Sequence, residues 1–82
     1  MLTSNQVHTL QRIAAPVSGS MQRKQYPGWP SSYLDMRSVE ALERRGLIES
    51  AIHKYKQGIQ PNAVVCYVIT DAGREALAAH SD

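Results

Sequence analysis

Two segments of the chain, ALERRGLIE at 41–49 and YVITDAGREAL at 67–77, constrain the fold more than any other feature. In the first, Gly46 follows two arginines, a pattern typical of a helix C-terminus, because glycine adopts the left-handed conformation and cations favour that end of the helix dipole. In the second, Thr70 or Asp71 lies where a helix N-cap is expected, after a run rich in β-branched residues. The segments therefore predict the end of one helix, a strand and the start of another helix.

The N-terminal region is expected to form a helix over about 4–15. Thr3 and Gln6 have the spacing of a capping box, and apolar residues then recur at helical spacing on one side. The following segment, 17–32, is rich in Gly and Pro and shows no apolar period, so only a short helical turn over 21–25 is suggested there.

A second long helix is predicted from about 36 to 45. Asp35 occupies the N-cap position, with Ser32 as an alternative that would lengthen the helix by one turn. Met36 and Val39 begin an apolar face that continues through the helix and is expected to pack on the core.

The region between the two opening segments predicts a β-hairpin with strands over 49–56 and 63–69. The second strand is apolar on both faces, so one face is expected to meet a partner chain. A last helix is expected to run to about residue 79. The residues expected to form a long polar turn are Gln57, Gly58, Pro61 and Asn62.

The composition fits a single small domain over 1–82, with 43% hydrophobic and 20% charged residues. No apolar run approaches the roughly 18 residues of a membrane span, and the N-terminus lacks the pattern of a signal peptide, so a cytoplasmic protein is expected. The single Cys66 lies in an apolar run and is expected to be buried. We expect no metal or other cofactor and no enzymatic activity, because the sequence shows neither ligand spacing nor a catalytic constellation.

Positive charge is concentrated in the middle of the chain. The net charge is only +2, but residues 21–60 carry seven Lys and Arg against four Asp and Glu. Such a segment can neutralise phosphates, although a solvated surface of mixed charge has the same composition.

The order helix, glycine stop, hairpin and helix is that of the winged-helix fold, a helix-turn-helix variant. LERRGLIE at 42–49 and ITDAGREAL at 69–77 closely resemble the end of the recognition helix and the junction between wing and last helix in MarR-like and PadR-like bacterial and phage transcriptional regulators. The resemblance implies a small α+β winged-helix domain, with Gly73 leaving room for close packing in the last helix. The segment 17–32 departs from the family, because it lacks the apolar positions of a second helix.

The resemblance also implies binding to double-stranded DNA, with the helix over 35–45 in the major groove and the hairpin over 49–69 as the wing. A homodimer is expected, because one short helix gives little affinity. Arg37 is the best candidate for a base contact, since its guanidinium can bind guanine through two hydrogen bonds. The full set of expected DNA contacts is Arg37, Ser38, Ala41, Arg44, Arg45, His53, Lys54 and Lys56. In the opposing interpretation the arginines are solvated and pair with acidic neighbours, as in the Glu40 and Arg44 pair.

A second functional class remains open. The chain would then be a winged-helix interaction module, of phage or mobile-element origin, that binds a partner protein through Tyr26, Trp29 and the face of the strand over 63–69. A tryptophan in a loop of Gly and Pro nevertheless more often covers a small core than forms a binding hot spot.

Overall fold

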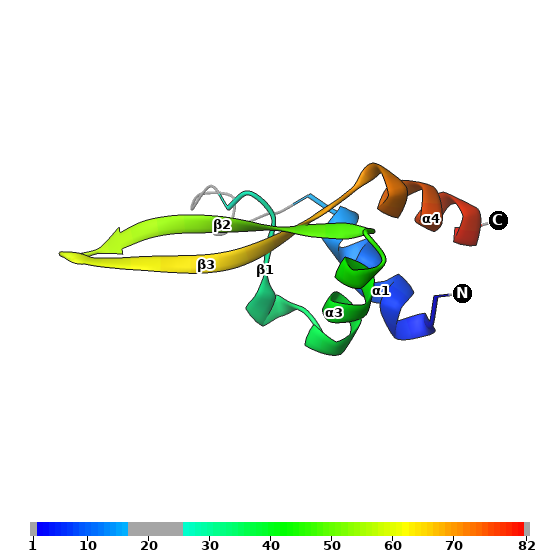
Figure 1. The fold of residues 1–82 in the computed structure, drawn as a ribbon, viewed down its shortest axis with the longest axis horizontal. Helices are drawn as coiled ribbons and strands as arrows, with labels where there is room; N and C mark the ends of the chain where they lie inside the picture. Colours follow the sequence, from blue (N-terminus) through cyan, green and yellow to red (C-terminus); the bar gives the residue numbers. More distant parts are fainter. Residues whose placement is uncertain (1, 17–25, 82) are drawn as a thin grey trace.

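The computed structural model describes residues 2–16 and 26–81, which form a small α+β fold (Figure 1). Its helices are α1 (Ser4–Ala14), α3 (Met36–Arg44) and α4 (Asp71–Ser81), its strands are β1 (Trp29–Pro30), β2 (Ile48–Gln57) and β3 (Gln60–Ile69), and a 3₁₀ turn, η1 (Ser31–Tyr33), follows β1. The α+β class agrees with the prediction. The helical turn suggested over 21–25 lies outside the described residues. No helix in the described part of the chain is long and apolar enough to cross a membrane.

Helix α1 begins at the capping box that the sequence predicted. The Gln6 amide donates to Thr3 Oγ1 at 3.2 Å, and the Thr3 amide donates to Gln6 Oε1 at 3.1 Å. These two bonds satisfy backbone donors that the first turn leaves without helical partners. The buried side of α1 comprises Val7, Thr9, Leu10 and Ile13.

The three strands form an antiparallel sheet in the order β1, β3, β2. Strand β1 pairs with β3 at two positions only, Trp29 with Tyr67 and Pro30 with Cys66. Strands β2 and β3 pair along their full length, and their hairpin extends away from the helices, which gather at the other end of the molecule (Figure 1). The molecule measures 48 × 23 × 19 Å as a result.

The hairpin turn is tighter than predicted. The strands are joined by Gly58 and Ile59 alone, and the expected turn residues Pro61 and Asn62 belong to β3. Gly58 has φ of +67°, which a two-residue hairpin turn requires at its first central position. Proline has no backbone amide hydrogen to donate. Pro61 is tolerated because this end of β3 has only β2 as a neighbour in the described part of the chain, so no hydrogen bond to a strand on the other side is lost.

The hydrophobic core lies where α1 and α3 meet the base of the hairpin. Its buried members are Leu10, Ile13, Val39, Leu42, Ile48 and Tyr67. Cys66 is also fully buried, as predicted, and burial raises the pKa of its thiol, although a hydrogen bond from the Gly28 backbone opposes the shift. The base of the hairpin is therefore held by the helices, whereas its outer part is not.

One prediction about α3 is wrong in two places. Met36 was expected on the core face but is 43% exposed, and Ser38 was expected on the exposed face but is only 4% exposed. The Ser38 hydroxyl tolerates burial because it donates to Asp35 Oδ2 at 2.8 Å. Asp35 occupies the predicted N-cap position, but its side chain makes no hydrogen bond to the helix backbone.

The end of α3 and the start of α4 are joined at the base of the hairpin. Gly46 has φ of +75° and turns the chain after α3, as predicted. The Thr70 hydroxyl donates to the Gly46 carbonyl at 2.7 Å, and the Thr70 amide donates to the Leu47 carbonyl at 3.0 Å. The Gly73 amide in turn donates to Thr70 Oγ1 at 3.1 Å, which confirms Thr70 as the residue that caps α4.

Gly73 allows this junction to close. A Cβ atom at this position would overlap the Leu47 carbonyl oxygen and would lie 2.7 Å from Ile69 Cγ1. The first turn of α4 therefore packs against the chain between α3 and β2 at a distance that no other residue type permits, as the sequence predicted.

Candidate nucleic-acid interface

Helix α3 presents a row of arginines to solvent. Arg37 and Arg44 are exposed on the side opposite Val39 and Leu42, and Arg45 is exposed at the C-cap. These three side chains form no hydrogen bond or ion pair with other residues of the described ranges, so the expected Glu40 and Arg44 pair is not formed. Ala41 is half-buried beside this row.

Helix α3 also carries two exposed acidic residues, Glu40 and Glu43. Burial raises the pKa of the Tyr67 phenol, and the carboxylates of Glu43 and Glu40 raise it further. Both carboxylates belong to α3, whose residues Val39 and Leu42 share the core with Tyr67.

The hairpin has two faces, because successive residues of a strand point to opposite sides. We call the side on which Ile48 and Tyr67 pack against the helices the helix face. Counting outward by twos, Lys54 and Lys56 lie on this face and are exposed. The structure therefore places the two expected wing lysines on the same side of the sheet as α3.

His53 lies on the opposite face of the hairpin. Its ring contacts Tyr26 edge to face, with the centroids 4.8 Å apart, and stacks on Tyr55 at 6.0 Å. It is half-buried in this aromatic row. The structure therefore does not bring His53 together with Lys54 and Lys56, although the three are nearly adjacent in sequence.

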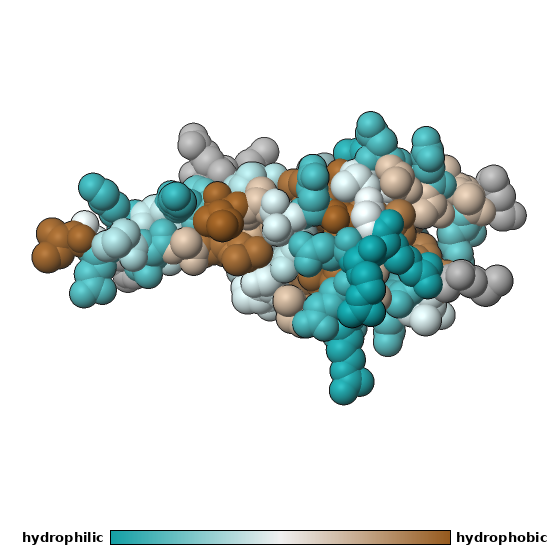
Figure 2. Space-filling model, in the orientation of Figure 1, coloured by the Kyte–Doolittle hydropathy of each residue, from teal (hydrophilic) through white to brown (hydrophobic). Residues whose placement is uncertain are grey.

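The hairpin exposes apolar residues on both strands, of which the sequence indicated only those of the strand over 63–69 and not Ile52 or Ile59. Ile52 pairs with Val65 on the helix face, and they are 60% and 39% exposed; Ile59 at the tip is fully solvated. Figure 2 shows apolar side chains gathered midway along the hairpin and at its end. The signal was available in the alternation of Ile52, Lys54 and Lys56 on one strand opposite Val65 on the other.

Trp29 has a structural role. Its Nε1 donates to the Ala15 carbonyl at 2.8 Å, just beyond the end of α1, and its ring meets Tyr33 at a centroid distance of 6.4 Å. The indole is half-buried. These contacts fit the expectation that the tryptophan covers a small core.

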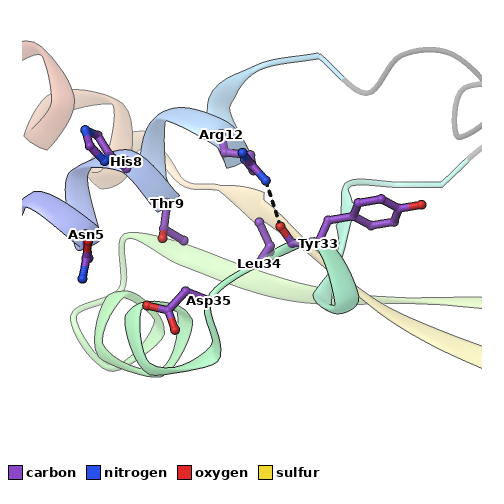
Figure 3. Close-up of a pocket in the computed structure, with 7 residues that line it drawn as sticks. All are labelled: Asn5, His8, Thr9, Arg12, Tyr33, Leu34 and Asp35. Atoms are coloured by element: carbon purple, nitrogen blue, oxygen red, sulfur yellow. Dashed lines mark hydrogen bonds between the residues drawn. The ribbon is translucent and has the colours of Figure 1, made fainter.

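A shallow groove separates α1 from the segment that leads into α3 (Figure 3). Its lining residues are Asn5, His8, Thr9, Arg12, Tyr33, Leu34 and Asp35, and its volume is about 240 Å³. Arg12 Nη1 crosses to the Tyr33 carbonyl at 3.1 Å. The groove is smaller than the roughly 300–1,000 Å³ of typical ligand pockets. The bond from Arg12 across it links α1 to the segment that leads into α3.

Among the described residues, no group of three His, Cys, Asp or Glu side chains is placed to hold a metal ion. Comparison with known proteins finds no matching family model, no similar curated protein and no similar solved structure.

Proposed function

We propose that the protein binds double-stranded DNA as a winged-helix transcriptional regulator, with α3 in the major groove and the β2–β3 hairpin in the position of the wing. The observation that supports this most directly is the set of uncommitted arginines on α3. The order of α1, α3, hairpin and α4, with β1 paired to β3, also supports the proposal.

The spacing of these arginines suits a duplex. Arg37 and Arg44 are seven residues apart, so they lie on the same side of α3 and about 10 Å from each other along its axis. Arg37 in the first turn can reach a base edge through its planar fork, and Arg44 and Arg45 can bind phosphates. Ser38 is not part of this surface, because it is buried.

Acidic residues of α3 are expected to limit its affinity for DNA. Glu40 and Glu43 lie on the same helix as the arginines and repel phosphates. A single α3 would therefore bind weakly, and two copies of the chain, each presenting one α3, would give two half-sites. Lys54 and Lys56 are exposed on the same side of the sheet as α3, so they can bind the phosphate backbone beside it.

Fluorescence anisotropy with a labelled random duplex, measured over a series of salt concentrations, tests the proposal. We expect binding at low salt that weakens linearly on a log–log plot, because each phosphate contact releases a counterion. Arg37→Ala combined with Arg44→Ala is expected to weaken binding and to reduce the salt slope by about one for each lost phosphate contact.

The matched control is Arg74→Ala, which removes one exposed arginine from α4 rather than from α3. If Arg37→Ala alone and Arg74→Ala weaken binding equally, only net charge matters and the assignment of α3 is wrong. If the wild-type protein does not bind DNA at low salt, DNA binding itself is wrong, and the exposed hairpin then favours the alternative of a protein-interaction module.

A further inference from the structure

Ile59 lies at the tip of the hairpin, where the geometry of the turn does not require an isoleucine. The turn needs the positive φ of Gly58, but turn positions beside such a glycine are more often filled by small polar residues. The Ile59 side chain is 97% exposed, and Figure 2 shows that the end of the hairpin is apolar. This side chain is therefore a candidate contact for a partner that the tip reaches first.

The hairpin projects far enough to reach a second groove of a duplex. We call residues 52–65, which lie beyond the two positions paired with β1, the arm. Its β2 strand, 52–57, extends about 20 Å at roughly 3.3 Å per residue. One turn of B-form DNA, about 34–36 Å, contains one major and one minor groove, so neighbouring grooves lie roughly 17 Å apart. With α3 in a major groove, the arm is long enough to reach the adjacent minor groove.

The net positive charge of the chain belongs to the arm. The arm carries Lys54 and Lys56 and no acidic residue, whereas the rest of the chain has seven Lys and Arg against seven Asp and Glu. The two lysines line a hollow of about 610 Å³ on the arm, together with Tyr55, Pro61, Asn62 and Ala63. The surface behind the tip is therefore complementary to a phosphate backbone.

An apolar tip in front of basic strands suits the minor groove. This groove is only about 6 Å wide in B-form DNA, so a β-ribbon enters it where the duplex kinks and the groove opens. Proteins that bind there stabilise such kinks by inserting an apolar side chain between two base pairs. Gln60, which is exposed next to Ile59, adds an amide that can donate to the acceptors on the groove floor.

We propose that Ile59 inserts between two base pairs from the minor groove and bends the duplex. This inference rests on the proposed binding of DNA and adds a distortion of the duplex to it. Lys54 and Lys56 bind phosphates along the arm. Because the isoleucine forms no hydrogen bond with a base, the preferred sites are those whose base steps unstack most easily, and these are pyrimidine–purine steps such as TA.

Energy transfer between dyes at the two ends of a short duplex with a central TA step measures the bend. Binding of the wild-type chain at low salt is expected to raise the transfer, because the ends approach each other. A nick at the TA step removes part of the cost of bending, so the wild type is expected to bind the nicked duplex roughly tenfold more tightly than the intact one. Ile59→Ser is expected to lose both the rise in transfer and the preference for the nick.

Two further variants separate the tip from the rest of the arm. Ile52→Ser makes the same chemical change at an exposed position away from the tip, and Ile59→Leu keeps an apolar side chain there, so both are expected to bend the duplex as the wild type does. Circular dichroism checks that each variant is folded.

The failure of this inference differs from the failure of DNA binding. A wild type that binds the duplex without bending it, or an Ile59→Ser variant that bends it equally, overturns the insertion of Ile59 and leaves the proposed function in place. Loss of the bend in Ile52→Ser would also overturn it, because the effect would not belong to the tip. A wild type that binds no duplex at low salt overturns both.

Discussion

The close packing at Gly73 predicts that alanine at this position lowers the stability of the fold, whereas helix propensity alone predicts that it raises it. In Gly73→Ala, the new Cβ meets the Leu47 carbonyl oxygen and the Ile69 side chain, so the first turn of α4 must move away from the chain after α3. The movement stretches the two hydrogen bonds from Thr70 to the carbonyls of Gly46 and Leu47. Propensity alone would make alanine better than glycine in a helix by about 1 kcal/mol.

The structure gives a net loss for Gly73→Ala. Overpacking costs about 1–3 kcal/mol, and each weakened hydrogen bond costs about 1 kcal/mol. After the gain in propensity, about 3 kcal/mol of stability is lost, out of the roughly 4–12 kcal/mol expected for 82 residues. The melting temperature should fall by roughly 12 °C or more.

Urea unfolding followed by circular dichroism measures this difference directly, provided that the slope with denaturant is unchanged. The matched control is Ala72→Gly, an exposed neighbour in the same turn, for which a loss of up to about 1 kcal/mol is expected from propensity. A Gly73→Ala variant as stable as wild type, or more stable, would refute the close packing of α4 on the Leu47 carbonyl.

Two further predictions concern aromatic residues of the core. Trp29→Phe removes the bond from Nε1 to the Ala15 carbonyl and is expected to cost about 1–2 kcal/mol in urea unfolding, so an unchanged midpoint would contradict the role of the indole at the end of α1. For Tyr67, the folded pKa lies above the ordinary value of 10.0. Its contribution is therefore fully present below pH 10 and is lost as pH rises through the folded pKa. Tyr67→Phe should lose less stability than wild type above pH 10, and parallel pH profiles would contradict this.

Local signals made much of this fold predictable. The capping box at Thr3, the glycine at 46 and the cap at Thr70 each act within a few residues, so their bonds are visible in sequence spacing. The α3 helix and both long strands were predicted for the same reason, with ends displaced by at most three residues.

Features that depend on distant contacts were not predictable in this way. Strand β1 is two residues long and exists only because it pairs with β3, so it has no period to detect. Ser38 tolerates burial because Asp35 accepts a hydrogen bond from its hydroxyl, and Met36 is exposed because the core lies on the other side of α3. In the candidate interface, the arginines were identified correctly as exposed, but the separation of His53 from the two lysines required knowledge of the strand register.

The bonds at the base of the hairpin have a consequence for how the chain can vary. Because Thr70 binds the carbonyls of Gly46 and Leu47, the polypeptide leaves the helical end of the molecule and returns to it at the same point. The two ends of the β2–β3 hairpin are thus fixed beside each other. Removing two residues from each strand near the tip would keep every remaining side chain on the same face of the hairpin. The reach of the arm can therefore be tuned independently of the body that anchors it.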